Sequence, residues 1–190
     1  MINQVYTVQH RRKRIGKTDY RKRLKLLLGH KPRLVVRKSL KHISLQIVEF
    51  EPKGDKVLLS AHSSELRKHG WKASTGNLSA AYLTGLLLAK KAGKKLLCVT
   101  DLGQQTSVKG CVLYAAVQGA IDGGLDIPCS KEIVPSKERI RGDHVAAFAK
   151  SLKANKERYA RQFGSYLKAN LDPEKLPSHF DEVKAKIGGK

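Results

Sequence analysis

Acidic and aromatic residues are both scarce in this chain of 190 residues. Aspartate and glutamate number 16 against 38 lysines and arginines, which leaves a formal net charge of +22. Like charges at this density repel one another, so such an excess usually serves to attract nucleic acid or an anionic membrane. Aromatic residues make up only 6% of the chain, and the 41% apolar content therefore predicts one aliphatic, alanine-rich core.

Long hydrophobic runs are absent as well. The longest nearly uncharged apolar stretch is Leu78–Ala89, which is too short to span a bilayer and is followed by Lys90 and Lys91. The first ten residues lead into arginines and do not resemble a signal peptide. We therefore expect a cytoplasmic protein without a membrane partner.

Motifs typical of enzymes and metal sites are missing. The three cysteines, Cys98, Cys111 and Cys129, form no CxxC pair, so we interpret them as small core residues rather than zinc ligands. No GxSxG or HExxH motif occurs, and Gly103–Gly110 lacks the Gly-Lys-Ser/Thr ending of a nucleotide-binding loop. We expect no catalysis, no cofactor and no small-molecule substrate.

Two alternatives concern the predicted strands and the loop after them. Ser107 and Lys109 fit either an RNA phosphate at a helix N-terminus or a simple helix cap. A metal-dependent nuclease would need converging carboxylates. The acids on or near the predicted strands are Glu49, Glu51, Asp101 and Asp126. The sheet that would present them is flanked by cations.

Lysine and arginine concentrate in one stretch, residues 11–41. Fourteen of its thirty-one residues are cationic and Asp19 is its only acid, so it carries more than half of the net charge. Arginine can bind phosphate through two parallel hydrogen bonds, and basic arms can fold against RNA grooves. We therefore predict an RNA-binding surface here and on a neighbouring loop. Its candidate residues are Arg11, Arg12, Lys13, Arg14, Lys17, Tyr20, Arg21, Lys22, Arg23, Lys25, Lys31, Arg33, Arg37, Lys38, Lys41, Trp71, Lys72 and Asn77.

The basic stretch begins with an arm and a helix. Residues 11–17 lack partners for their charges, so we expect an arm that is disordered or is ordered only against RNA. Thr18 is a suitable N-cap for a helix that ends near Gly29, before Pro32. The apolar face of this helix, which we expect to fasten it to the core, comprises Tyr20, Leu24, Leu27 and Leu28.

The middle of the chain predicts an α/β fold. Three strands with short connections imply an antiparallel meander, and they cover residues 33–38, 42–50 and 56–61. Helices over 77–92 and 109–122 alternate with strands over 96–100 and 126–130. The order β-β-β-α-β-α-β then gives a mixed sheet. Gly85 is expected to bring its helix close to that sheet.

We divide the chain into three parts. Residues 1–31 form the basic RNA-binding arm and helix, residues 32–140 the α/β core, and residues 141–190 a helical C-terminal extension. Apolar residues are too numerous in the extension for a random coil, so we expect it to dock on the core or on a partner. Trp71, the only tryptophan, fits either a stacking platform for a base or a core anchor.

Five phrases of the sequence together resemble a known family. They are RRKRIGKTDYRKRLKLLLGHKPRLVVRKS, GWKASTGNLSAAYLTGLLLAKKA, VQGAIDGGLDIPCS, RIRGDHV and LPSHFDEVKAKI. Over essentially its whole length the chain is similar to the archaeal and eukaryotic form of the universal L-eighteen family of large-subunit ribosomal proteins, which bind 5S ribosomal RNA. One departure is Cys129, where the family pattern has histidine.

The resemblance implies a ribonuclease-H-like core without catalytic carboxylates. It also implies binding to 5S rRNA and attachment of this RNA to the large-subunit rRNA in the central protuberance, beside another 5S-binding ribosomal protein. The RNA-binding character of the family carries onto Arg11–Arg14, Lys17, Arg21, Arg23, Lys31, Arg33 and Arg37. The alternative is a generic RNA- or DNA-binding chaperone that has no preference for 5S rRNA.

Overall fold

A four-stranded mixed sheet organises the computed structural model, which describes residues 7–93 and 95–189. The strands lie in the order β3-β2-β1-β4. Pairing is antiparallel between β1 and β2 and between β2 and β3, whereas β4 runs parallel to β1. The strand bounds are β1 (Arg33–Lys38), β2 (Ile43–Glu49), β3 (Lys56–His62) and β4 (Val99–Asp101). The predicted meander and the parallel crossover to β4 are confirmed.

Helices make up most of the remaining described chain. Two are short 3-10 helices, η1 (Ser63–His69) and η2 (Pro173–Lys175). The α-helices are α1 (Arg11–Arg14), α2 (Tyr20–Leu27), α3 (Leu78–Ala92), α4 (Val112–Asp122), α5 (Lys137–Arg141), α6 (Asp143–Leu152), α7 (Lys156–Lys168) and α8 (Leu176–Gly188). None of those within residues 7–93 and 95–189 is both long and apolar enough to cross a membrane.

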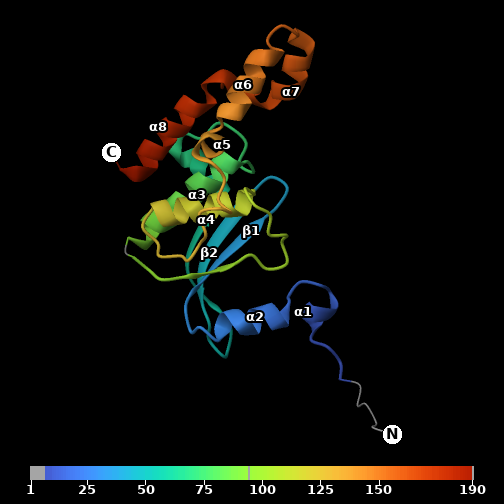
Figure 1. The fold of residues 1–190 in the computed structure, drawn as a ribbon, viewed down its shortest axis with the longest axis vertical. Helices are drawn as coiled ribbons and strands as arrows, with labels where there is room; N and C mark the ends of the chain where they lie inside the picture. Colours follow the sequence, from blue (N-terminus) through green and yellow to red (C-terminus); the bar gives the residue numbers. More distant parts are fainter. Residues whose placement is uncertain (1–6, 94, 190) are drawn as a thin grey trace.

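Within the described residues, α3 and α4 cover one face of the sheet. Alternate residues of a strand point to opposite faces, and the apolar set packs beneath α3 and α4 (Figure 1). The fully buried members of this set include Leu34, Val36, Ile43, Leu45 and Ile47. The opposite face carries half-buried Val35 and Gln46, and Val57 on it is 50% exposed. One face of the sheet therefore remains open beside α2.

The strand predicted for residues 126–130 is wrong. Only one parallel bridge, between Leu97 and Asp126, lies there. The strand predicted over 96–100 is also displaced, because β4 covers Val99–Asp101. Glycines and prolines around this region, such as Gly124 and Pro128, leave few residues that can extend a ladder.

α3 and α4 cross at two glycines. A Cβ on Gly85 would overlap the carbonyl oxygen of Ala116, and a Cβ on Gly119 would overlap that of Tyr82. The expectation that Gly85 faces the sheet is therefore wrong, because its missing side chain makes room for the backbone of α4. This helix pair covers the apolar face of the sheet and holds it in place.

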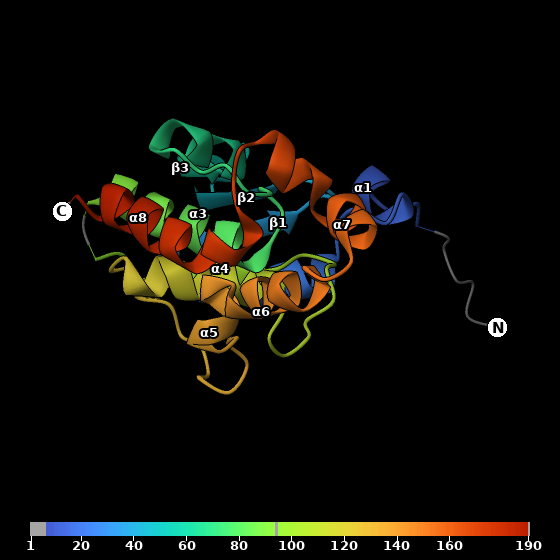
Figure 2. The ribbon, with the colours of Figure 1, turned by 90° about the horizontal axis from the view of Figure 1, so that it is seen from above.

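The C-terminal extension docks on the core through α8. This helix lies beside α3 (Figure 2) and buries Leu176, Phe180, Val183 and Ile187. The predicted docking on the core is confirmed for this segment. The α6–α7 hairpin projects beyond α8, at the end of the molecule opposite α1 and α2 (Figure 1).

Replacing Gly119 by alanine tests the helix crossing. We expect Gly119→Ala to lower the free energy of unfolding by on the order of 1–3 kcal/mol, because two packed helix backbones must separate. The matched control is Gly164→Ala in α7, where an added Cβ meets nothing within 4 Å. Urea denaturation should show that the control is neutral or slightly stabilising, and equal losses in the two variants would contradict the close contact.

Candidate nucleic-acid interface

The turn before α2 is built around Asp19. Its Oδ1 accepts hydrogen bonds from the backbone N–H of Arg21 at 3.0 Å and of Lys22 at 3.2 Å. The N-cap is therefore Asp19 and not Thr18, whose hydroxyl accepts from the Arg12 Nε at 2.9 Å. The bond from the Lys22 backbone is the largest cause that lowers the pKa of the Asp19 carboxyl.

The basic arm has more regular structure than expected. Arg11–Arg14 form one helical turn, although a disordered segment was predicted for residues 11–17. The Arg12 carbonyl accepts from the backbone N–H of Lys17 at 2.9 Å and of Thr18 at 3.2 Å. Local backbone hydrogen bonds thus fold this segment while every side chain of α1 stays unburied. The arm's residues 1–6 lie outside the described residues.

α2 has no fully buried residue. Leu24 is 61% exposed and Leu28 is 68% exposed, so the prediction that these two residues fasten the helix to the core is wrong. The other two residues of that face, Tyr20 and Leu27, are half-buried, as are Arg23 and Leu26. Arg23 pairs with the carboxylate of Asp55, which lies just before β3.

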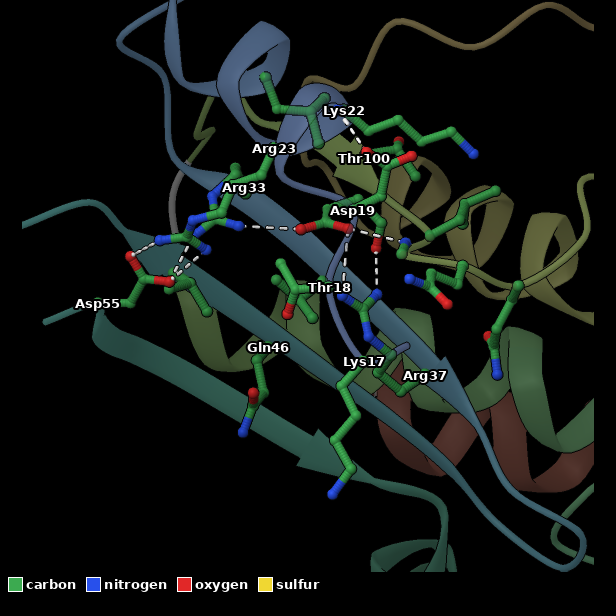
Figure 3. A pocket seen from close by; sticks show the side chains of 18 of the residues that line it. Lys17, Thr18, Asp19, Lys22, Arg23, Arg33, Arg37, Gln46, Asp55 and Thr100 are labelled. Atoms are coloured by element: carbon green, nitrogen blue, oxygen red, sulfur yellow. Dashed lines mark hydrogen bonds and ion pairs between the residues drawn. The ribbon is translucent and has the colours of Figure 1, made fainter. Parts of the chain in front are cut away.

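Five alternating charges join α2 to the sheet (Figure 3). Arg23 donates two hydrogen bonds to Asp55, at 2.9 Å and 2.8 Å. Arg33 Nη2 donates to the same carboxylate at 2.7 Å, and its Nη1 donates to Asp101 at 2.9 Å. Arg37 completes the set by donating to the Asp101 side chain at 3.1 Å and to its carbonyl oxygen at 2.7 Å. We call Arg23, Asp55, Arg33, Asp101 and Arg37 the charge chain.

Burial of the charge chain is deepest in the middle. The side chain of Arg33 is 3% exposed and that of Asp101 is 10% exposed, whereas that of Arg37 is 42% exposed. The Asp55 carboxyl has its pKa lowered mainly by the hydrogen bond from Arg23 and further by Arg33. The same bond raises the pKa of Arg23. Each ionised form thus stabilises the other.

A groove of about 900 Å³ lies between α2 and the open face of the sheet (Figure 3). Apolar and neutral residues form its floor, including Val35, Gln46, Val48 and Val57. Cations and polar groups surround this floor, and they include Arg12, Lys17, Lys22, Lys25, Arg37, Gln104, Gln105 and Ser107. The groove therefore has an apolar base, polar walls and a positive rim, which suits a nucleotide chain with its bases inward and phosphates outward.

Most predicted site residues gather at this end of the molecule. The exposed cations of α1, α2 and the adjoining loops are Arg11, Arg12, Lys13, Arg14, Lys17, Arg21, Lys22, Lys25 and Lys31. Tyr20 is half-buried with its ring centroid 5.2 Å from that of His10. We call the nine exposed cations, from Arg11 to Lys31 in the list above, the N-terminal basic surface.

Other predicted residues lie at the far end of β1. Lys38 and Lys41 are exposed there, and the loop with Lys72 is joined to them because Thr75 donates to the Lys41 carbonyl at 2.8 Å. Asn77 is the N-cap of α3, where its side chain accepts from the backbone N–H of Ala80 at 2.8 Å. These residues are therefore separated from α2 by the length of β1.

Two predicted RNA ligands are buried. Arg33 is 2% exposed and its guanidinium is occupied by two carboxylates. Trp71 is 2% exposed, stacks on His179 at 5.1 Å between ring centroids and donates its indole N–H to Ser74. Of the two alternatives for Trp71, the structure supports the core anchor, because neither face of the ring is open to a base.

Sequence reasoning missed Asp55 as part of the site and considered Asp101 only as a possible nuclease acid. Both are among only 16 acids in a strongly basic chain, and this scarcity was the sequence signal that could have pointed to their role in the site. Within the described parts of the chain, no group of three or more His, Cys, Asp or Glu side chains is placed to hold a metal ion. The three cysteines are free, and Cys98 is buried.

Removing one carboxylate tests the charge chain. Asp101→Asn should lower the free energy of unfolding by about 3 kcal/mol, because it leaves the buried Arg33 short of a countercharge. The control is Asp126→Asn, which removes an exposed partner of Lys95 at 3.6 Å and should cost less than about 1 kcal/mol. Denaturation that gives equal losses would contradict a stabilising role for the charge chain.

The pH dependence of the Arg23–Asp55 contact has a definite sign. A lowered Asp55 pKa means that the contact stabilises the fold above the ordinary carboxyl pKa, and that this stabilisation is lost as pH falls through the lower folded value. Carbon-13 NMR of the Asp55 carboxyl should give a midpoint below 3.8, and Arg23→Gln should raise it. An unchanged midpoint in the variant would contradict the pairing.

One known protein family matches the N-terminal half of the chain. Residues 4–97, which include α1, α2, the meander and α3, match the family described as ribosomal large subunit proteins 60S L5, and 50S L18. The match covers the N-terminal basic surface and most of the charge chain. The chain belongs to this family of large-subunit ribosomal proteins.

Proposed function

We propose that the protein binds 5S rRNA through the N-terminal basic surface and the groove beside it, and helps to attach this RNA to the large-subunit rRNA in the central protuberance. The observation that carries the proposal is the gathering of nine exposed cations on α1, α2 and the adjoining loops, four of which line an open groove, namely Arg12, Lys17, Lys22 and Lys25. Membership of the family supports it, because a large-subunit ribosomal protein works among rRNA and other ribosomal proteins. This family belongs to the cytoplasmic ribosome and is a structural class rather than an enzyme class.

The charge chain gives the proposed RNA contact a fixed direction. Arg23 ties α2 to Asp55, so Arg21, Lys22 and Lys25 are presented at a constant position relative to the sheet. A preorganised surface loses less conformational entropy on binding than a flexible basic tail does. The N-terminal arm can then adjust its conformation to the RNA, while α2 fixes the position of the bound RNA relative to the sheet.

The mechanism is neutralisation of phosphates together with fit of shape. Lysine and arginine release counterions when they contact phosphates, so about 6–10 contacts would reduce affinity by about 10³–10⁵ between 50 and 200 mM salt, by analogy with duplex DNA. Arg37, which is only partly exposed, lines the groove and can bond to a sugar or base edge. Arg33 and Trp71 take no part in this contact.

Three finer proposals concern the division of the chain, the arrangement of the core and the neighbouring protein. We assign residues 1–31 to RNA binding, residues 32–140 to the supporting core and residues 141–190 to the extension. We also propose that the core follows the ribonuclease-H-like arrangement, which the order β3-β2-β1-β4 and the bridge from Leu97 to Asp126 support. The other 5S-binding ribosomal protein is the proposed neighbour.

A charge-removal variant tests the proposed interface. Replacing Arg11, Arg12, Lys13, Arg14 and Lys17 by alanine should weaken 5S rRNA binding and reduce the salt slope by about 4, because about five phosphate contacts are lost. The control removes five exposed lysines elsewhere, namely Lys68, Lys90, Lys131, Lys137 and Lys175. Fluorescence anisotropy at several salt concentrations measures both variants, and equal slopes would contradict the N-terminal basic surface as the binding site.

Competition with another RNA separates the two candidate functions. A 5S-binding ribosomal protein should release labelled 5S rRNA much less readily to an unrelated structured RNA than to unlabelled 5S rRNA. A generic nucleic-acid chaperone would treat the two competitors alike. Equal competition would therefore favour the chaperone.

A further inference from the structure

β1 runs past its parallel neighbour in the sheet. β4 pairs with β1 only as far as Asp101, which lies opposite Val35, whereas β1 continues to Lys38. A strand without a neighbour leaves N–H and C=O groups at an open edge, and such groups need other partners. The loop that follows β4 supplies them. We call residues 102–107 the wall loop, because most of them line the groove beside α2.

Gln105 of the wall loop takes the place of the missing strand. Its Oε1 accepts from the backbone N–H of Lys38 at 3.2 Å, and its Nε2 donates to the Lys38 carbonyl at 2.7 Å. A side-chain amide offers an acceptor and a donor, as a peptide group does, so these two bonds continue the ladder along β1. Both ends of the half-buried Gln105 amide are thus occupied, and the wall loop is fastened to the sheet.

The start of the wall loop is held by Arg37 and Gly103. The Arg37 guanidinium donates to the Val36 carbonyl at 2.8 Å and to the Asp101 side chain at 3.1 Å. Gly103 has a φ of +63°, and an added Cβ there would lie 2.9 Å from the Arg37 Cζ. The Gly103 N–H also donates to the Asp101 carboxylate at 2.8 Å. Glycine suits this position, because the positive φ and the close guanidinium both disfavour a side chain.

The end of the wall loop is joined to α4. The Ser107 hydroxyl and the Tyr114 hydroxyl form a hydrogen bond, and the Leu102 side chain packs against the core at the other end of the loop. The wall loop is therefore anchored at both ends and in its middle. The side chain of Gln104, by contrast, is exposed at the groove and forms no hydrogen bond with another described residue.

The chemistry of Gln104 differs from that of the cations around the groove. Lysine and arginine can neutralise phosphates, which carry no sequence information. A neutral amide cannot do so, but its donor and acceptor can pair with the edge of a base, as glutamine does with adenine in DNA. Because the wall loop is anchored, Gln104 can meet a base without the entropy cost of ordering a flexible loop. Its place on the groove wall therefore fits recognition of a base rather than general attraction.

We propose that Gln104 is a specificity-determining residue that reads the edge of a base in the groove, and that Gln105 is a positioning residue that holds Gln104 in place through the wall loop. This inference rests on the proposed binding of 5S rRNA in the groove. It assigns affinity to the N-terminal basic surface and discrimination between RNAs to the wall loop. The two contributions differ in their dependence on salt, since only the first involves charge.

Competition binding with the full-length protein tests the proposal. Gln104→Ala and Gln105→Leu should each reduce the preference for 5S rRNA over an unrelated structured RNA about fivefold or more. The slope of affinity against salt should stay unchanged, because no charge is removed. Matched controls are Gln162→Ala, which alters an exposed glutamine of α7, and Gln118→Leu, which removes an amide bonded to Asp122 at 2.7 Å. Both controls should keep the full preference.

A double variant separates positioning from direct contact. If Gln105 acts through Gln104, Gln105→Leu combined with Gln104→Ala should lose no more preference than Gln104→Ala alone. Hydrogen exchange in the free protein gives a readout without RNA, because the Lys38 amide should exchange faster in Gln105→Leu than in Gln118→Leu. Additive losses or an equal exchange rate in these two variants would contradict the positioning role.

Failure of this inference differs from failure of the proposed function. A preference that persists in Gln104→Ala, or that falls equally in Gln162→Ala, overturns the inference and leaves the proposed function standing. If the unaltered protein shows no preference for 5S rRNA, the proposed function fails and the reading by Gln104 fails with it. Gln104→Ala alters an exposed side chain, so circular dichroism should show an intact fold.

Discussion

The buried guanidinium of Arg33 is the constraint on which this structure depends. A charge that is 3% exposed is tolerated only when carboxylates pair with it. Asp101 supplies one carboxylate from β4 and Asp55 supplies the other just before β3, so both edges of the sheet contribute. Asp55 also holds Arg23 of α2. A residue that resembles an RNA ligand in the sequence thus positions the helix that carries the exposed cations.

The strands could be predicted because their signal is local. Alternation of Ile43, Leu45 and Ile47 defines a face, and the turn residues around it fix an antiparallel connection. The side on which α2 packs could not be predicted in this way. A helical stripe such as Leu24 and Leu28 shows which residues share a face, and says nothing about what covers it. The deciding partner of α2, Asp55, is 32 residues from Arg23.

The concentration of lysine and arginine in the basic stretch, residues 11–41, predicted the exposed part of the candidate site, because this signal is also local in the sequence. So many cations cannot all be buried, and most of residues 11–25 are indeed at the surface. The same reasoning failed for single members of the pattern. Arg33 and Trp71 are buried by tertiary contacts, and the loop after Trp71 is joined to His179 by a hydrogen bond between residues 107 positions apart. Composition identifies a surface, whereas burial of one residue depends on distant chain segments.

The long separations within the charge chain also set an order of events during synthesis. The N-terminal arm and α2 leave the ribosome first, but Asp55 follows Arg23 by 32 residues and Asp101 follows Arg33 by 68. Until those acids have been synthesised, Arg23 and Arg33 have no carboxylate partner within the chain. Burial of Arg33 would then leave its charge unpaired. A nascent chain therefore exposes its most basic segment before the fold can direct it. Asp55, which pairs with both Arg23 and Arg33, is the first acid that can hold this segment against the sheet, and Asp101 on β4 then completes the pairing of Arg33.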